Sequence, residues 1–199
     1  NDFTEAMYYR LAQAVSFSNS FIKNASELSG DEVNVFIAEA RFLRAYAYYN
    51  LLDLYGNVPL TTEISTELPT QSNRTELFNF IESELMEIES ILLASNEYGR
   101  VDNVAAHALL SRLYLNAEAW TGQDRYADCI TYSQNVINSG YTLNMNDANG
   151  NGTAYDELFM ADNDVNGAQN EFIFTLNFDG MQSQTYGGTT FLVHAAIGG

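Results

Sequence analysis

The feature that most constrains the fold is a long apolar stripe of helical spacing within residues 31–55. Apolar side chains recur there every three or four positions, at Phe42, Tyr46, Tyr49 and Leu52. This spacing places them on one face of an α-helix. Asp31 is suited to cap the start of the helix, and Gly56 followed by Pro59 is typical of its end. The sequence therefore predicts one long helix over 31–55.

Further stretches have the same helical spacing of apolar residues, at 3–24, 74–94, 102–119 and 124–138. Asn73 followed by Glu76 resembles a capping box, and Asp102 is suited to cap the helix that follows it. Short links between successive helices favour antiparallel pairs stacked side by side. A short pattern that begins at Ala38 recurs in similar form at Ala105. The distance between the two is close to two tetratricopeptide periods of roughly 34 residues each. The predicted fold class is therefore mainly α, with tetratricopeptide-like stacked helix pairs.

Some polar and aromatic residues of these helices need a role. Arg41 and Arg44 lie on an otherwise apolar helix, so we expect them to pair with acidic neighbours or to extend to solvent. Trp120 is expected to pack between two helices. The helix predicted at 74–94 also carries four glutamates, most of which are expected to face water: Glu82, Glu84, Glu87 and Glu89.

The character of the chain changes after Gly140. Residues 147–152 are rich in Asn, Asp and Gly, which is typical of loops. Residues 172–178 have the composition of a strand, and residues 180–188 are small and polar, as in many binding loops. We therefore divide the chain into a helical scaffold, 1–140, and a segment of loops and a strand, 141–199.

Charge and composition restrict the partners. The formal net charge of −18 repels nucleic acid and anionic membranes, whereas a neutral partner meets no such repulsion. No apolar run is long enough to cross a bilayer as a helix. Cys129 is the only cysteine, so it has no internal disulfide partner, and we expect it to be a small, buried hydrophobic residue. Neither end shows a signal peptide or a closing element, so we expect a piece of a longer protein.

Catalytic motifs are missing from the sequence. It contains neither a His-Glu-x-x-His zinc motif nor a Gly-x-Ser-x-Gly elbow nor a Gly-Lys-Ser/Thr phosphate loop. A glycosidase needs only two well-placed carboxylates, but the 26 acidic residues concentrate on predicted helix faces, where solvated surface is the simpler interpretation. We therefore predict a protein that is not an enzyme.

A family resemblance rests on residues 38–62. They begin with Ala38-Glu39-Ala40-Arg41-Phe42-Leu43-Arg44, continue through an aromatic run, and end in a turn with Gly56-Asn57-Val58-Pro59-Leu60. This combination closely resembles the hallmark of SusD/RagB-like proteins, the outer-membrane glycan-binding lipoproteins of Bacteroidetes. Later landmarks are similar at 108–118, 158–163, 170–174 and 185–191. Family members are commonly more than twice as long, so the resemblance implies a partial chain whose second segment begins a truncated, glycan-facing subdomain.

The resemblance implies a function. SusD-like proteins are lipid-anchored on the external face of the outer membrane, and their helix pairs pack on a SusC-like TonB-dependent transporter. The expected activity is non-catalytic binding of a neutral oligosaccharide or polysaccharide, with a starch-type glucan favoured, for uptake through that transporter. The lipid anchor would lie outside this chain. The alternative is a tetratricopeptide-type protein-interaction scaffold without a glycan site of its own.

Tyr186 is the main candidate for sugar contact. It lies in a polar segment with Gln182 and Gln184, away from any helical apolar stripe, and the family places a sugar-contacting aromatic residue near this point. Sugars present apolar C–H faces and hydroxyl groups, so a flat ring with nearby amides suits them. The competing interpretation is a structural tyrosine that fixes a loop.

Two stretches resemble the start of a calcium loop. They begin at Asp147 and at Asp162, and each ends in Gly after alternating Asn or Asp residues. Neither has the Glu that an EF-hand needs at its twelfth position, so turn chemistry explains most of the pattern. Some SusD-like proteins carry a structural calcium, and Asp162 and Asp164 are the candidate ligands here. No cofactor is required by the predicted function.

Overall fold

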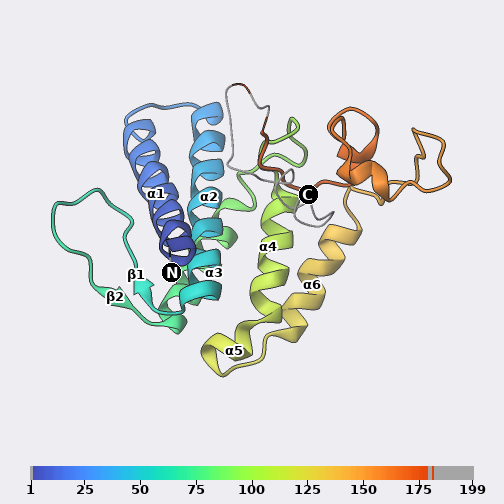
Figure 1. The fold of residues 1–199 in the computed structure, drawn as a ribbon. Helices are drawn as coiled ribbons and strands as arrows, with labels where there is room; N and C mark the ends of the chain where they lie inside the picture. The colour runs from blue at the N-terminus through green and yellow to red at the C-terminus, as the bar shows by residue number, and fades with distance from the viewer. Residues whose placement is uncertain (1, 179–180, 182–199) are drawn as a thin grey trace.

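The computed structural model describes residues 2–178 and residue 181, and these form a row of packed helices (Figure 1). The described helices are α1 (Asp2–Ala25), α2 (Asp31–Tyr55), α3 (Arg74–Ile88), α4 (Asn103–Leu115), α5 (Ala117–Thr121) and α6 (Tyr126–Ile137). Helix α1 packs on α2, α2 packs on α3, and α6 lies against α4. The mainly α fold of tetratricopeptide type is confirmed, whereas the division at residue 140 stays a prediction.

The predicted caps are confirmed at two helices. At α3, Asn73 Oδ1 accepts the N–H of Glu76 at 3.0 Å and Glu76 Oε2 accepts the N–H of Asn73 at 2.9 Å. At α4, Asp102 Oδ1 accepts the N–H of Ala105 at 2.9 Å. Each bond satisfies a backbone donor that the first turn leaves unpaired. Helix α2 differs, because Asp31 is its first residue and Gly30 before it supplies no side-chain cap.

Two predicted helices are shorter than expected. Helix α3 ends at Ile88 instead of residue 94, because the Leu93 carbonyl accepts the N–H of Asn103 at 2.9 Å and so joins the start of α4. The helix predicted over 102–119 breaks at Asn116 into α4 and α5. The Asn116 amide donates to the Arg112 carbonyl at 3.0 Å, a local bond of the kind that competes with regular helix geometry.

The strand predicted over 172–178 is wrong for the part of the chain that the structure describes, where these residues are irregular. Among the described residues, the sheet consists of a short antiparallel pair, β1 (Val58–Pro59) and β2 (Gln71–Ser72). It does not include residues 172–178. The apolar residues of the segment pack on α2 instead. The Phe174 ring lies edge-on to the rings of Phe42 at 5.3 Å and Tyr46 at 5.9 Å.

A buried ion pair joins the first three helices. Arg44 of α2 donates to Glu84 Oε2 of α3 from Nη2 at 2.5 Å and from Nε at 3.0 Å, and its Nη1 donates to Asn19 Oδ1 of α1 at 2.8 Å. Arg41 donates to Glu84 Oε1 from Nη2 at 2.6 Å. The predicted pairing of both arginines is confirmed. Glu84 was expected to face water, but it is 6% exposed, because a buried guanidinium needs a carboxylate beside it.

The apolar core lies between α2, α3 and α4. Its most buried members include Tyr48, Leu77, Ile81, Leu85, Leu110 and Leu113. Trp120 of α5 packs against this core, with its ring edge-on to Tyr49 at 5.8 Å, so its predicted packing role is confirmed. Cys129 of α6 is half-buried against the same cluster. Among the described helices, none is both long enough and apolar enough to cross a membrane.

Candidate functional site

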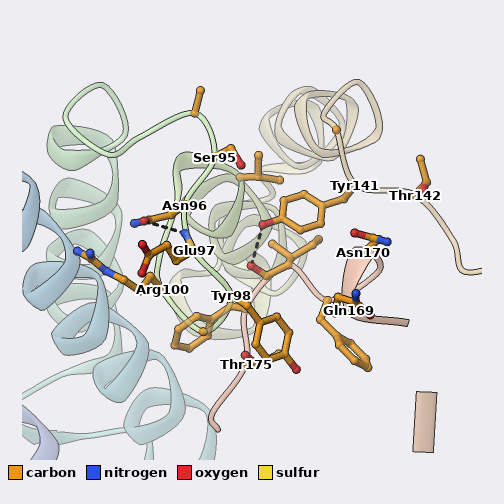
Figure 2. A pocket seen from close by; sticks show the side chains of 17 residues that line it. Ser95, Asn96, Glu97, Tyr98, Arg100, Tyr141, Thr142, Gln169, Asn170 and Thr175 are labelled. Carbon is orange, nitrogen blue, oxygen red and sulfur yellow. Dashed lines mark hydrogen bonds between the residues drawn. The ribbon is translucent and has the colours of Figure 1, made fainter. Parts of the chain in front are cut away.

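Three segments that are distant in sequence enclose a cleft of about 430 Å³ (Figure 2). They are residues 94–100 after α3, residues 140–142 after α6, and residues 169–175. The last segment comes after the 3₁₀ helix η1 (Asp156–Phe159) and begins within the 3₁₀ helix η2 (Ala168–Asn170). This volume lies within the range of small-molecule sites. The cleft therefore forms where the helical scaffold meets the loop segment.

Tyr141 forms a fixed side of the cleft. Its hydroxyl donates to Asp102 Oδ2 at 2.7 Å, and the other oxygen of Asp102 caps α4. Burial, and next the hydrogen bond to the Asp102 carboxylate, raise the pKa of Tyr141 well above its usual range. The phenol is therefore neutral at physiological pH, and its orientation is tied to the first turn of α4.

On the side of the cleft opposite Tyr141, the polar side chains already form hydrogen bonds with a residue of α2. Arg100 Nη2 donates to both carboxylate oxygens of Glu39 at 2.8 Å, and its guanidinium lies over the ring of Phe36 at 5.0 Å. Asn96 Nδ2 donates to Glu39 Oε1 at 2.7 Å and to the Val101 carbonyl at 2.8 Å. These contacts neutralise the Arg100 charge and hold residues 96–101 on α2.

Gly99 lies next to Tyr98 in a backbone conformation that favours glycine. Its φ is +82°, a conformation that residues with a Cβ rarely adopt, and an added Cβ would lie 2.2 Å from Nδ2 of Asn177. A side chain at this position would have to displace the Asn177 amide and would be strained by the positive φ. The backbone conformation of the loop that carries Tyr98 therefore favours glycine here.

The remaining groups at the cleft are available to a ligand. Tyr98 is 41% exposed, and its side chain makes no hydrogen bond or ring contact with any residue that the structure describes. The hydroxyls of Ser95 and Thr142 are exposed and likewise unpaired within the described part of the chain. The cleft therefore has an accessible ring and free hydroxyl groups at separate positions of its lining, and this combination suits a ligand with both an apolar face and polar edges.

The candidate residues from the sequence fall elsewhere. Tyr186, Gln184 and Gln182 lie outside the described residues, so their role stays a prediction. Tyr98 was missed, although the same reasoning applies to it as to Tyr186, because it also lies in a polar stretch that ends in glycine. Tyr141 could not be assigned from sequence, because its partner Asp102 lies 39 positions away.

Asp162 and Asp164 are both exposed in the turn between η1 and η2. Asp162 Oδ1 accepts the Asn166 amide at 3.4 Å. Within 2–178, no group of three or more His, Cys, Asp or Glu side chains is arranged to hold a metal ion. Calcium also accepts backbone carbonyl, amide and water oxygens, so the calcium site at Asp162 and Asp164 stays a prediction.

A buried carboxylate stabilises these loops instead. Glu157 is 2% exposed, and its Oε1 accepts the N–H of Asn149 at 2.7 Å while its Oε2 accepts the Asn166 amide at 3.0 Å. Asp147 Oδ1 accepts the N–H of Gly150 at 2.8 Å. The interpretation of residues 147–152 as turn chemistry is confirmed.

Residues 2–115 match a SusD-like family that is described as starch-binding and associating with the outer membrane. The chain belongs to the SusD-like family. It is 40% identical over 193 residues to the starch-binding protein SusD of Bacteroides thetaiotaomicron, covering 96% of this chain and 34% of that protein. The present SusD-like chain thus spans about a third of the length of this relative.

Solved structures agree with this assignment. A SusD-like protein from Bacteroides fragilis superposes with a TM-score of 0.72 at 25% identity, covering 88% of this chain and 34% of that one. A protein described as a laminarin-binding SusD-like protein superposes with a TM-score of 0.69 at 25% identity, covering 81% and 36% of the two chains. The predicted family is therefore confirmed.

Proposed function

We propose that this protein binds a neutral glycan without transforming it, and that a starch-type glucan is its ligand. The observation that carries the proposal is the 40% identity, over 96% of the chain, to a protein named for starch binding. A second relative is named for binding laminarin. Both named ligands are uncharged glucose polymers, and such a ligand meets no repulsion from a chain of net charge −18.

We further propose that binding takes place on the external face of the outer membrane and serves uptake through a SusC-like TonB-dependent transporter. The family description, which names the outer membrane, supports the location. The stacked helix pairs supply a rigid surface suited to packing on a transporter. A scaffold without any glycan site is the less favoured alternative, because the relatives are named for their carbohydrate ligands.

The test is retention of the protein in native gels that contain soluble starch, laminarin or a polyanionic polysaccharide. We expect strong retardation by starch, weaker retardation by laminarin, and none by the polyanion. Reducing sugar should not accumulate when protein and starch are incubated together. Migration unchanged by every polysaccharide would contradict the proposal.

A separate substitution tests the sugar contact predicted at Tyr186. Tyr186→Ala should reduce retardation by starch, because the variant removes the flat ring on which a glucose unit would lie. Tyr155→Ala is a matched control, since Tyr155 is also a loop tyrosine and is 69% exposed. Equal starch binding by wild type and Tyr186→Ala would remove Tyr186 from the site while leaving the glycan proposal intact.

A further inference from the structure

We propose that the cleft around Tyr98 is a second glucan subsite, separate from the contact predicted at Tyr186. This inference rests on the proposed function, because it assigns a further contact to the same neutral glycan. The subsite would place the apolar face of one glucose unit on the Tyr98 ring, with its hydroxyls at the polar edges of the cleft (Figure 2).

The first argument is the accessibility of unpaired groups. The Tyr98 ring is 41% exposed within a cleft of about 430 Å³, and it is packed against no other described ring. Exposed tyrosines elsewhere in the described chain already have partners. Tyr126 donates to Glu118 at 2.6 Å, and the Tyr155 ring contacts Phe159 at 5.3 Å. Tyr98 is thus an accessible ring at the edge of a concave surface.

The second argument is that the cleft is nearly neutral. Arg100 is paired with Glu39, the Tyr141 hydroxyl donates to Asp102, and Asp102 itself is 1% exposed. Glu97 is the carboxylate that remains exposed among the described residues lining the cleft. An anionic ligand would meet this carboxylate and the negative net charge, and a basic peptide would find a single charge to pair with. A neutral polyol is the best match.

The third argument is that the site is preorganised. Asn96 and Arg100 fix the loop before and after Tyr98 to Glu39 of α2, and Tyr141 is fixed to the cap of α4. A ligand that enters the cleft therefore does not have to order these walls, which lowers the entropic cost of binding.

The test is calorimetric titration of the protein with maltoheptaose. Tyr98→Ala should weaken the affinity about three- to tenfold, as expected for one lost aromatic contact. Tyr98→Phe keeps the ring and should remain within about twofold of wild type. Tyr126→Ala is the matched control and should bind like wild type, because Tyr126 is 46% exposed and begins α6, whereas the cleft residues 140–142 follow the opposite end of that helix.

The outcomes separate the two proposals. If wild type binds no glucan, the proposed function fails and the subsite fails with it. If wild type and Tyr98→Ala bind maltoheptaose equally, the subsite is overturned and the proposed function stands. Equal losses in Tyr98→Ala and Tyr126→Ala would also overturn the subsite, because they would indicate a general effect of truncating a surface tyrosine.

Nitration by tetranitromethane gives an independent readout. Saturating maltoheptaose should lower the nitration of Tyr98 several-fold, while Tyr126 should react at its ligand-free rate. Unchanged nitration of Tyr98 under conditions where calorimetry shows saturation would overturn the subsite.

Discussion

The helices between residues 31 and 121 and the loops between 141 and 178 are stabilised in different ways. In the helical region, Ile81, Leu85, Leu110 and Leu113 have no exposed surface, and apolar burial supplies most of the stabilisation. In the loop region, Leu143 and Met145 are 75% and 85% exposed, and Asn, Asp and Glu side chains hold the backbone by hydrogen bonds. The first region is therefore a cooperative core, whereas the second depends on local bonds.

The cleft lies at the boundary between these two regions. Tyr141 and Phe174 of the loop region contact Asp102 and Phe42 of the helical region. The cleft thus combines one wall anchored on the apolar helical core with another held by hydrogen bonds and ring contacts across the boundary. Four substitutions, in order of decreasing effect, test this comparison.

The largest effect is expected from Arg44→Ala. It leaves Glu84 Oε2 buried without its guanidinium partner, although Arg41 still pairs with Oε1, and it should lower the free energy of unfolding by about 3–5 kcal/mol. Urea unfolding followed by circular dichroism at 222 nm measures this change. Glu87→Ala is the control, because the Glu87 side chain is 60% exposed and its bond to Arg41 should contribute no more than about 1 kcal/mol. Similar effects of both variants would contradict the role given to the buried pair.

Leu110→Ala is expected to follow. Leu110 is fully buried in α4, so its truncation should cost about 3 kcal/mol through lost burial and a residual cavity. Leu115 lies on the same helix at 56% exposure, and Leu115→Ala should cost less than about 1 kcal/mol. The same unfolding experiment compares them, and equal losses would show that the core is not centred on α3 and α4.

The sequence predicted the helical region well because burial imposes a period. The stripe from Phe42 to Leu52 and the caps at Asn73 and Asp102 are local signals, and each is found where it was expected. Local signals failed where the outcome depends on a distant partner. In sequence, Glu84 cannot be distinguished from its neighbours Glu82 and Glu87. It is buried because Arg44 of α2 packs beside it in the tertiary structure.

The loop region was harder to predict for the same reason. The apolar residues between 172 and 178 suit a strand, but a strand needs a neighbouring strand, and Phe174 finds α2 instead. The cleft could not be predicted because Tyr98, Tyr141 and Thr175 come together only through the tertiary fold. Tyr98 alone had a readable signal, an aromatic residue in a polar turn.

Asp102→Ala tests the connection between the two regions. It removes the cap of α4 and the partner of Tyr141, so we expect a loss of about 2 kcal/mol. Tyr141→Phe removes only the bond across the boundary and should cost about 1 kcal/mol. A double-mutant cycle measures their coupling. Additive losses would show that the two regions are not linked through this bond.

The smallest global effect is expected from Glu157→Ala. The loops around Asn149 and Asn166 lose their shared acceptor, but no helix from α1 to α6 depends on it. The free energy of unfolding measured from the helix signal should therefore change by less than about 1 kcal/mol. Amide hydrogen exchange at residues 149 and 166–168 should accelerate strongly. A loss as large as that of Leu110→Ala would show that the loops belong to the same cooperative unit as the core.

Hydrogen exchange of the protein with and without saturating soluble starch tests the central claim most directly. We predict that amides of α2 and α4 exchange slowly in both conditions, and that peptides covering residues 94–100 and 169–175 become protected when starch is added. Starch that leaves exchange unchanged throughout the chain would contradict the account, because neither a glycan site nor its boundary position would then remain.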